Sequence, residues 1–187
     1  NSKKDSNMRP IPSNANLTFS LITPEQEALV LSWLRKPHVN EWFHGPGLQN
    51  TIDGIKAFID NKNPRFDLWV ASLDGDPFAF LITFDVHDSE ATDPDCHFAK
   101  WIEIGKKSIT LGLLIGDEKY LGKGLSVPLI QNFISDKYPD VKIVFIDPET
   151  SNTKAIHVYK KAGFKKIDDF PASWHLVPHI LMQLKRP

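Results

Sequence analysis

Two glycines separated by one residue precede an apolar segment in the second half of the chain. The stretch YLGKGLSVPLIQNF (120–133) places Gly122 and Gly124 directly before residues whose apolar positions recur at helical spacing. Glycine lets consecutive main-chain N–H groups approach a ligand closely, and the first four N–H groups of a helix lack a partner within that helix. Phosphate is the ligand that such a helix start typically binds. The sequence therefore predicts a phosphate-binding loop at this position.

Three kinds of phosphate site share part of this pattern. A P-loop requires G-x-x-x-x-G-K-[ST], and it does not fit because Lys123 lies between the two glycines. A dinucleotide site is the stronger alternative, because a strand, Gly122-x-Gly124, a helix and a second strand ending in Asp147 imitate its first unit. Against it, Val127 occupies the third glycine position, and only forty residues follow Asp147. The third kind is a loop for the pyrophosphate of coenzyme A.

A second motif lies further along the chain, in SNTKAIHVYKKAGF (151–164). It resembles the segment of the GNAT superfamily of acyl-CoA-dependent N-acyltransferases that runs Asn, two spacers, Ala-Ile, two spacers, Tyr and then Lys-x-Gly-Phe. LGKGLS (121–126) is similar to the pyrophosphate loop of that superfamily, Q/R-x-x-G-x-G/A, with Leu121 and Ser126 as mild departures. Both motifs stand in the order and spacing of the superfamily, and the resemblance extends over roughly residues 17–185.

The resemblance implies a fold, a coenzyme and a set of coenzyme-binding residues. The implied fold is an α+β (α/β) domain with a central, mostly antiparallel, splayed mixed sheet that is flanked by helices. The implied coenzyme is acetyl-CoA, whose pantetheine arm lies beside a splayed strand that offers main-chain N–H groups to the acetyl carbonyl. By this resemblance the coenzyme-binding residues are Leu113, Leu114, Ile115, Leu121, Gly122, Lys123, Gly124, Leu125, Ser126, Asn152, Ala155 and Tyr159.

Within the superfamily the chain looks most like the aminoglycoside 6′-N-acetyltransferases. Their first helix and aromatic loop are similar to LSWLRKPHVNEWF (31–43), and their Asp-Pro segment is similar to IDPETSN (146–152). The strand aspartate that these enzymes place before the loop falls at Gly112 in this chain. The hydroxylysine acyltransferases of siderophore synthesis are the alternative, although they usually carry a histidine where this chain has Gly112 or Leu113. The resemblance implies acetylation of a primary amine, with the 6′-amine of an aminoglycoside as the first candidate.

Acyl transfer to an amine requires an acceptor for the amine proton and a donor for the departing thiolate. Tyr159 is the candidate donor, because a phenol with a pKa of about 10 can protonate a sulfur of comparable pKa. Packing beside Ala155 and Ile156 on the apolar face of a helix is the alternative role for Tyr159. Asn152 also fits two roles, since it can cap the same helix or bind the pantetheine arm.

Asp147 is the candidate base, through its match to the substrate-contacting aspartate of the aminoglycoside enzymes. The alternative is an Asp-Pro turn that ends a strand. Asp85, Glu103 and an ordered water are further candidates for the base. The sequence does not choose among them.

Acidic and aromatic residues indicate where a cationic acceptor would bind. The stretch DVHDSEATDPD (85–95) holds five acidic residues and no Lys or Arg, and such a rim attracts polycations over a screening length of about 8 Å. A solvated loop is the alternative for this stretch, as core packing is for the tryptophans. The candidate substrate-binding residues are Glu41, Trp42, Asp85, Trp101, Glu103 and Asp147.

Composition limits the other function classes. The formal net charge of the 187 residues is −1, so the bulk charge gives no reason to expect a nucleic-acid partner. No segment reaches the roughly 18 apolar residues of a membrane span, and the single cysteine, Cys96, fits a reducing compartment, so we expect a cytoplasmic protein. His175 and His179 lie in a strand-like segment rather than on one helical face, so we expect no metal. Cys96 has no histidine motif beside it, which favours direct transfer over an acyl-enzyme.

The hydrophobic pattern predicts the elements that position these residues. Residues 1–16 are polar and are expected to form a tail, which leaves a single domain over 17–187. Thr23, Pro24 and Gln26 predict a helix start with a capping box, and Pro37 predicts the end of that helix. Strands are expected at 17–22, 67–73, 78–87, 108–116 and 141–147, helices at 23–36, 51–60, from about Gly124 and at 151–163, and a last strand pair or bent strand at 174–185.

Overall fold

The computed structural model of the chain describes residues 16–62, 64–170 and 177–187. In these residues one seven-stranded sheet has the order β1-β2-β3-β4-β5-β7-β6. The strands are β1 (Leu17–Leu21), β2 (Asp67–Leu73), β3 (Asp76–Val86), β4 (Ser108–Ile115), β5 (Ile143–Ile146), β6 (Lys165–Phe170) and β7 (His179–Lys185). The α-helices are α1 (Glu27–Trp33), α2 (Pro37–Asn40), α3 (Gly45–Ile59), α4 (Ser126–Lys137) and α5 (Thr153–Lys161). Short 3-10 helices are η1 (Pro24–Gln26), η2 (Asp88–Thr92), η3 (Ala99–Trp101) and η4 (Glu118–Tyr120).

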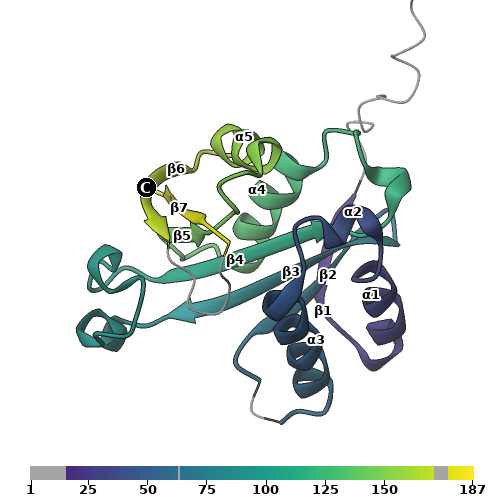
Figure 1. Ribbon diagram of the computed structural model, residues 1–187, viewed down its shortest axis with the longest axis horizontal. Coiled ribbons are helices and arrows are strands. Elements are labelled where there is room, and N and C mark those ends of the chain that lie inside the picture. The colour runs from purple at the N-terminus through teal and green to yellow at the C-terminus, as the bar shows by residue number, and fades with distance from the viewer. Residues whose placement is uncertain (1–15, 63, 171–176) are drawn as a thin grey trace, which may run out of the picture.

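The sheet is mixed, with one parallel pair among antiparallel neighbours. Strands β4 and β5 run parallel, whereas the other five neighbouring pairs are antiparallel. Figure 1 shows α4 and α5 over one face of the sheet and α1, α2 and α3 over the other. The expected α+β architecture, a mostly antiparallel sheet flanked by helices, is confirmed.

Strand alternation divides the core between the two faces of the sheet. On β3, Leu81 packs in the cluster beneath α4, whereas its neighbour Phe80 packs in the cluster beneath α1 and α3. This follows from the two-residue period of a strand, which sends successive side chains to opposite faces. A third, smaller cluster lies on the face away from α4 and joins Ile143 and Phe145 of β5 to Phe170.

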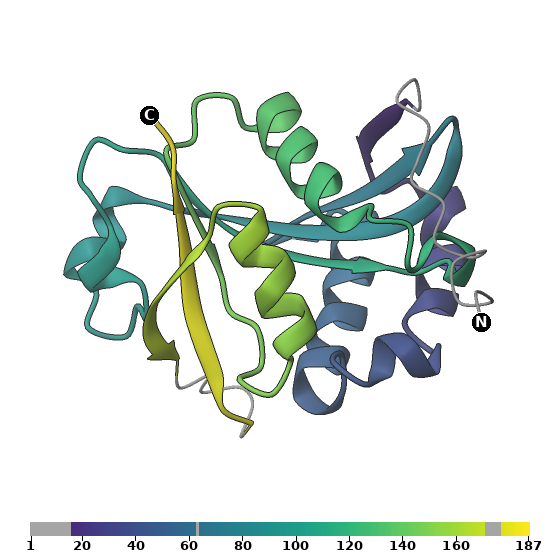
Figure 2. The ribbon, with the colours of Figure 1, turned by 90° about the horizontal axis from the view of Figure 1, so that it is seen from above.

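The sheet opens between its two parallel strands. β4 pairs with β5 only through Ser108, Ile109 and Thr110, and no described strand pairs with this edge of β4 beyond Thr110. Figure 2 shows β7 running steeply across the direction of β3 and β4, with α5 over the opening. We call the opening bordered by Leu111–Ile115 the gap.

The main-chain groups that face the gap follow from the hydrogen bonding of β4 to β3. The Gly116 N–H donates to the Phe78 carbonyl at 2.8 Å, and the register of β4 on β3 runs without a shift from Val86 to Ala79. Because hydrogen-bonding direction alternates along an antiparallel pair, even-numbered residues of β4 bond to β3. The main-chain groups of Leu111, Leu113 and Ile115 therefore point into the gap.

Most predicted elements are confirmed, and the differences have local causes. The first helix begins as η1, where the Thr23 N–H donates to Gln26 Oε1 at 3.1 Å, and α1 ends at Trp33. Pro37 then starts the short helix α2 instead of only ending α1, because its fixed φ suits a first helical position. The helix predicted at 51–60 starts earlier, at Gly45, again with a proline in its first turn.

Strand β6 was missed by the sequence pattern. Its residues, KKIDDF, are mostly charged and exposed because β6 is an edge strand, so no apolar run marks it. Residues 174–176 of the predicted last strand pair lie outside the described residues, and 179–185 form the single strand β7. Of the predicted tail, residues 1–15 lie outside the described residues, while the Asn16 N–H donates to Asp74 at 2.9 Å. In the described part of the chain no helix has the length and apolar character needed to cross a membrane.

Candidate active site

The two glycines form a turn with left-handed backbone conformation. Gly122 has φ of +69° and Gly124 has φ of +70°, a conformation that costs other residues roughly 1–2 kcal/mol. No atom lies within 4 Å of a Cβ built on either glycine, and both residues are exposed. The turn Gly122–Gly124, called the glycine turn below, thus requires glycine for its backbone shape, and it leaves open space beside its main chain.

Helix α4 begins immediately after the glycine turn. Ser126 is its first residue and Pro128 its third, so the missing N–H of proline falls in the first turn, where it interrupts no helical hydrogen bond. The predicted apolar stripe is confirmed, since Leu129, Ile130, Phe133 and Ile134 are all buried against the sheet. The unbonded first-turn N–H groups of α4 therefore adjoin the exposed main chain of the glycine turn.

Tyr120, just before the glycine turn, contacts the hairpin of β2 and β3. Its ring packs on Phe78 with centroids 5.0 Å apart, and its hydroxyl donates to the Asp76 carboxylate. Lys119 also binds Asp76, with 2.8 Å between Nζ and Oδ2. Burial and the hydrogen bond to Asp76 raise the pKa of Tyr120 to about 12, so the phenol stays protonated as a donor. Sequence analysis missed this contact because Asp76 lies 44 residues before Tyr120.

The predicted strand residues do not all face the gap. Leu113 and Ile115 direct their main chain into it, and the Ile115 carbonyl accepts a hydrogen bond from His38 Nε2 at 2.9 Å. Leu114 is even-numbered, so its main chain faces β3, where it pairs with Phe80, and its side chain is buried beneath α1. Of the three predicted strand residues, Leu113 and Ile115 thus fit a role beside the pantetheine arm, and Leu114 does not.

Asn152 and Tyr159 lie at the two ends of α5. Asn152 Oδ1 accepts a hydrogen bond from the Ala155 N–H at 3.2 Å, so the capping role considered for Asn152 is present. Tyr159 is partly buried, packs against the core beneath α4 and has its ring 6.1 Å from that of Phe164. Burial, followed by the charge of Asp147, raises the pKa of the Tyr159 phenol above its ordinary value.

Asp147 directly follows β5 and lies near Tyr159. Ile143 and Phe145 point to the cluster away from α4, and continuing the alternation by two residues directs Asp147 to the same face. Burial raises the pKa of the Asp147 carboxyl from 3.8 to about 7. The structure therefore brings the two predicted acid–base residues close enough for the charge of Asp147 to affect the pKa of Tyr159.

Two predicted acidic residues lie elsewhere. Asp85 borders a cavity with Tyr138 and Asp140 at the carboxyl end of α4, about 18 Å along this 12-residue helix from the glycine turn. Glu103 binds Lys185 at the far end of β7, at 3.3 Å, and this bond together with that to Lys106 lowers the pKa of Glu103, which makes it a weaker base. The structure places neither Asp85 nor Glu103 beside Asp147 and Tyr159.

The remaining acidic residues of the stretch 85–95 are engaged within their own loop. Asp88 accepts a hydrogen bond from the Gly105 N–H at 3.1 Å, and Asp93 accepts one from the Asp95 N–H at 2.9 Å. Trp101 packs in the cluster of β5 and Phe170, on the same face as Asp147. Asp88 and Asp93 are therefore bound within the loop, Trp101 packs at its base, and the substrate-binding role expected for this region stays a prediction.

Glu41 and Trp42 lie between α2 and α3, on the same face as Asp147. Glu41 is exposed and Trp42 is partly buried. Just after them, His44 Nε2 lies 2.6 Å from Glu149 Oε1. Sequence analysis missed this pair, since only the Asp-Pro-Glu order places Glu149 near Asp147 and nothing in the sequence connects it to His44.

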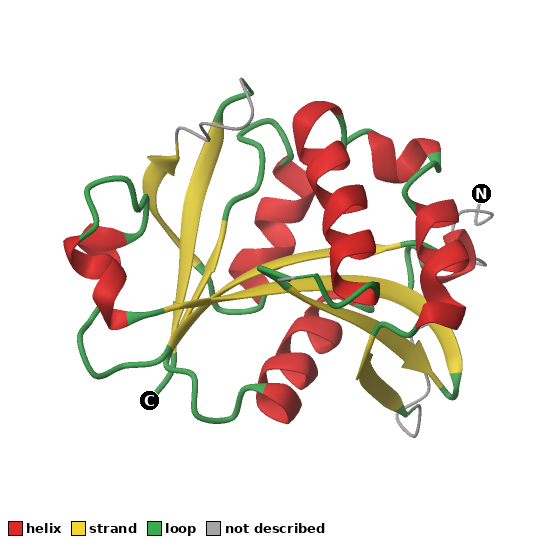
Figure 3. Ribbon diagram, turned by 90° about the horizontal axis from the view of Figure 1, so that it is seen from below, coloured by secondary structure: helices red, strands yellow, loops and turns green. Residues whose placement is uncertain are grey.

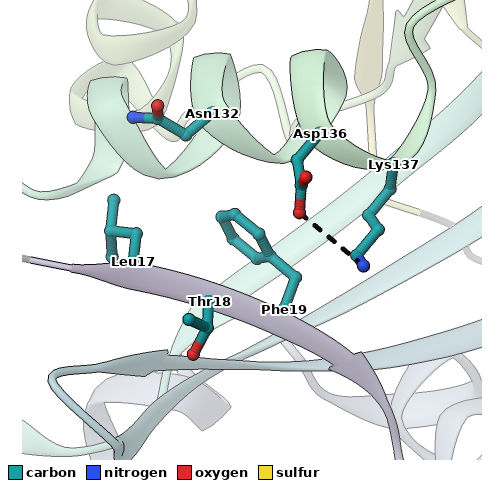
Figure 4. A pocket seen from close by; sticks show the side chains of 6 residues that line it. All are labelled: Leu17, Thr18, Phe19, Asn132, Asp136 and Lys137. Carbon is teal, nitrogen blue, oxygen red and sulfur yellow. Dashed lines mark ion pairs between the residues drawn. The ribbon is translucent and has the colours of Figure 1, made fainter.

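Neither of two surface hollows in the described part of the chain is lined by Asp147 or Tyr159. The larger, of about 440 Å³, lies between β1 and α4 and is shown in Figure 4 with Phe19, Asn132 and Asp136 among its lining side chains. The smaller, of about 300 Å³, is the one that Asp85 borders. The candidate site is defined by the opening of the sheet. Among the described residues no group of three or more His, Cys, Asp or Glu side chains is arranged to hold a metal ion, and His175 lies outside them.

The opened sheet and the glycine turn before α4 are the features that the resemblance to acyl-CoA-dependent transferases led us to expect. Residues 24–171 match the family described as acetyltransferase (GNAT) domain. The chain belongs to this family and is an N-acyltransferase, as its motifs predicted.

Named relatives resemble the chain over most of its length. A crystal structure of aminoglycoside N(6′)acetyltransferase from Legionella pneumophila is 42% identical, with a TM-score of 0.80 over 90% of this chain and 91% of that one. Aminoglycoside N(6′)-acetyltransferase type 1 from Klebsiella pneumoniae is 27% identical over 165 residues, which span 82% of this chain and 76% of the relative. A structure of AAC(6′)-Ib in complex with ribostamycin and coenzyme A is 22% identical, with a TM-score of 0.72 over 91% of this chain and 94% of that one. This last likeness concerns the fold alone.

Proposed function

We propose that the protein transfers the acetyl group of acetyl-CoA to the 6′-amine of an aminoglycoside. The observation that carries this proposal is the opening of the sheet beside β4, together with the glycine turn that leads into α4. Asp147 also lies close enough to Tyr159 for its charge to add to the effect of burial in raising the pKa of the phenol. The relatives named above support the choice of acceptor, because the Legionella enzyme named for this reaction is 42% identical over 90% of the chain.

The residues beside the gap fit acetyl-CoA. The glycine turn offers open main chain beside the first turn of α4, which suits the diphosphate. The coenzyme supplies a thioester, an acyl group already activated for attack by an amine. Leu113 and Ile115 direct main-chain groups into the gap, where the Leu113 N–H can stabilise the negative charge that develops on a carbonyl oxygen. The residues proposed to hold the diphosphate are Leu121, Gly122, Lys123, Gly124, Leu125 and Ser126.

Asp147 is proposed to accept the proton of the attacking amine. A carboxyl with an ordinary pKa is a weak base at neutral pH, and efficient proton transfer requires a pKa near the working pH. Burial raises the pKa of Asp147 to about 7, which meets this requirement. Because α5 covers one face of the sheet, the amine is proposed to approach from the other face, on the side of α2 and α3 (Figure 1 and Figure 3).

Tyr159 is proposed to give its proton to the departing thiolate. The phenol is protonated at neutral pH, and its pKa, raised mainly by burial, makes it a weaker acid than an ordinary tyrosine while Asp147 is charged. Part of that rise comes from the negative charge of Asp147, which disappears when Asp147 takes the proton of the amine. Proton uptake on one side of the gap thus makes proton release easier on the other. A proton passing from Asp147 to Tyr159 restores both groups.

A second acceptor class is tested against the aminoglycosides because of one local difference. Gly112 stands where the aminoglycoside enzymes carry a strand aspartate, and a Cβ built there has its nearest contact at 3.8 Å, on Ile82. That distance is an ordinary van der Waals contact, and by the resemblance the acceptor side has one carboxylate fewer than that group. A smaller amine with a single positive charge, such as a hydroxylysine-type substrate, suits that arrangement.

We also infer a cytoplasmic location and a role in antibiotic resistance. Acetyl-CoA is a cytoplasmic metabolite, and the single cysteine, Cys96, suits a reducing compartment. Acetylation removes one positive charge from an aminoglycoside, and with it part of the attraction of the drug to a polyanionic target.

Thiol release from acetyl-CoA tests the proposed function. We expect turnover with kanamycin and tobramycin, no turnover with an analogue that has a hydroxyl in place of the 6′-amine, and a mass increase of one acetyl group on the product. Hydroxylysine and lysine derivatives form the second arm of the panel. Turnover in that arm alone would overturn the aminoglycoside assignment and favour the second acceptor class. Coenzyme binding without turnover of any amine would overturn the proposal as a whole.

A further inference from the structure

The segment between α1 and α3 makes a tight corner on the acceptor face of the sheet. This corner, residues 37–44, consists of α2, the residues after it and the first residue before α3. Asn40 Nδ2 donates to the carbonyls of Leu34 at 2.6 Å and Phe43 at 3.2 Å, and Val39 is buried. These contacts hold the corner to α1 at one end and to α3 at the other, so its side chains have defined positions.

Two histidines of the corner reach the two strands that border the gap. His38 Nε2 donates to the carbonyl of Ile115, the last residue of β4, at 2.9 Å. His44 Nε2 lies 2.6 Å from Oε1 of Glu149, which follows β5. The contacts span 77 and 105 residues of sequence, so each joins the corner to a distant part of the chain. One short segment thus contacts both sides of the gap.

Glu149 is held firmly on its own side. It has 7% of its surface exposed, and its main chain forms an isolated antiparallel β-bridge with that of His179 at the start of β7. Thr150 donates its N–H to the Pro178 carbonyl at 2.9 Å, and the Ile180 N–H donates to the Pro148 carbonyl at 3.0 Å. A carboxylate that is this well buried is stable only when it is hydrogen-bonded or paired, and His44 provides such a partner.

Asp147 lies between β5 and this anchored segment. It is two residues before Glu149, so a shift of Glu149 changes the direction of the Asp147 carboxyl. A displacement of about 1 Å at a reacting group can reduce the rate of an enzyme about hundredfold. The His44–Glu149 contact is therefore placed to fix the base, while the His38–Ile115 contact is placed to fix the strand beside the coenzyme.

We propose that His38 and His44 are positioning residues, which together hold the two open strands at a set separation. In this arrangement His44, through Glu149, positions Asp147 and the amine, and His38 positions the edge of β4 for the thioester. The proposal rests on the acetyl transfer proposed above, since it assigns each histidine to one of the two substrates. It predicts that His44 affects kcat/KM for the amine, whereas His38 affects the Kd for acetyl-CoA.

Single substitutions separate the two roles. We expect His44→Ala to lower kcat/KM for the amine about tenfold to hundredfold, the range for losing a hydrogen bond to a charged group, with the Kd for acetyl-CoA within about twofold of wild type. His44→Gln keeps an N–H donor and should recover part of the loss. His38→Ala should raise the Kd for acetyl-CoA about fivefold, the scale of a neutral hydrogen bond.

The matched control removes a salt bridge far from the gap. Lys107 and Asp140 form an exposed pair near the carboxyl end of α4, and we expect Lys107→Ala to leave both constants unchanged. The proposal is overturned if His44→Ala and His38→Ala alter the same constant, or if His44→Gln behaves like His44→Ala with unchanged thermal unfolding.

Hydrogen exchange gives a measurement that does not depend on turnover. In His44→Ala we expect faster exchange at the amides of residues 38–45 and 147–150 together, with residues 108–110 unchanged. Absence of thiol release by the wild type with every amine would defeat the proposed function, yet coupled exchange would still support the joining of the strands. Exchange that changes at residues 38–45 alone would overturn the positioning role.

Discussion

The coenzyme side and the acceptor side of the gap are built from different parts of the polypeptide. On the coenzyme side, Gly122, Gly124 and the edge of β4 present main-chain groups, and the two glycines are exposed. On the acceptor side, Asp147 and Glu149 present side chains that burial and a contact across 105 residues hold in place. The first side is sensitive to backbone conformation and tolerant of side-chain identity. The acceptor side depends instead on the identity of its side chains. Substitutions on both sides test this contrast.

Asp147→Asn should have the largest effect, because it removes the proposed base and keeps the size of the side chain. Loss of general base catalysis typically costs about 10²- to 10⁴-fold in rate, and we expect a loss of kcat in this range with unchanged Kd for acetyl-CoA. Steady-state kinetics and calorimetry measure the two quantities. A variant with wild-type kcat would remove Asp147 from the chemistry.

The same carboxyl predicts how activity and stability depend on pH. The pKa of Asp147 is raised from 3.8 to about 7 by burial, so kcat/KM should fall about tenfold per pH unit below pH 7, as the base becomes protonated. Between these two pKa values the folded protein keeps a proton that the unfolded chain releases, so stability decreases as pH rises through this window. Asp147→Asn removes that decrease. Its Tm relative to wild type should therefore be higher at pH 8 than at pH 5, and an equal difference at both values would contradict the raised pKa.

Tyr159→Phe should lower kcat about hundredfold, the lower end of the range for general acid catalysis. The phenylalanine ring keeps the contact with Phe164 and the core, so coenzyme affinity and Tm should change little. A loss confined to Kd would assign Tyr159 to packing, the alternative that its helical spacing also allowed.

Gly124→Val should weaken acetyl-CoA binding about tenfold and leave the bound enzyme active. The expected size follows from the roughly 1–2 kcal/mol that a non-glycine residue pays in the left-handed region, since Gly124 has φ of +70°. The cause is backbone strain and the loss of open space beside the turn, because no protein atom lies within 4 Å of an added Cβ. Gly54→Ala is the matched control, since Gly54 lies inside α3 and also has no atom within 4 Å. It should leave the Kd unchanged and stabilise the fold slightly.

The coenzyme side could be predicted from sequence because its function depends on local backbone requirements. The pattern Gly122-x-Gly124 predicts a turn with left-handed backbone conformation at both glycines. The apolar stripe after it predicts which face of α4 packs against the sheet. The same local signals placed the strands from β1 to β5. Leu114 shows the limit, because which main-chain groups face the gap depends on the register between β4 and β3.

The acceptor side could not be predicted in the same way because it depends on distant contacts. Asp85 and Glu103 have the right charge for a base, yet the fold places them at the far ends of α4 and β7. Nothing in the sequence connects His44 with Glu149, and only the folded chain brings the two side chains together. Acidic residues in the sequence are therefore candidates for the catalytic base, and the fold of the chain decides which of them lie near the candidate site.

Tyr120→Phe should have the smallest effect and tests a distant contact on the coenzyme side. Its hydroxyl donates to Asp76, which ties the residues before the glycine turn to the β2–β3 hairpin. Removing the hydroxyl leaves the ring packed on Phe78 and Lys119 still bound to Asp76. We expect the Kd for acetyl-CoA to rise about threefold, in keeping with the loss of one partly exposed hydrogen bond, and kcat to stay unchanged. If kcat fell and Kd did not, the coenzyme side would also depend on side-chain chemistry, and the contrast between the two sides would no longer hold.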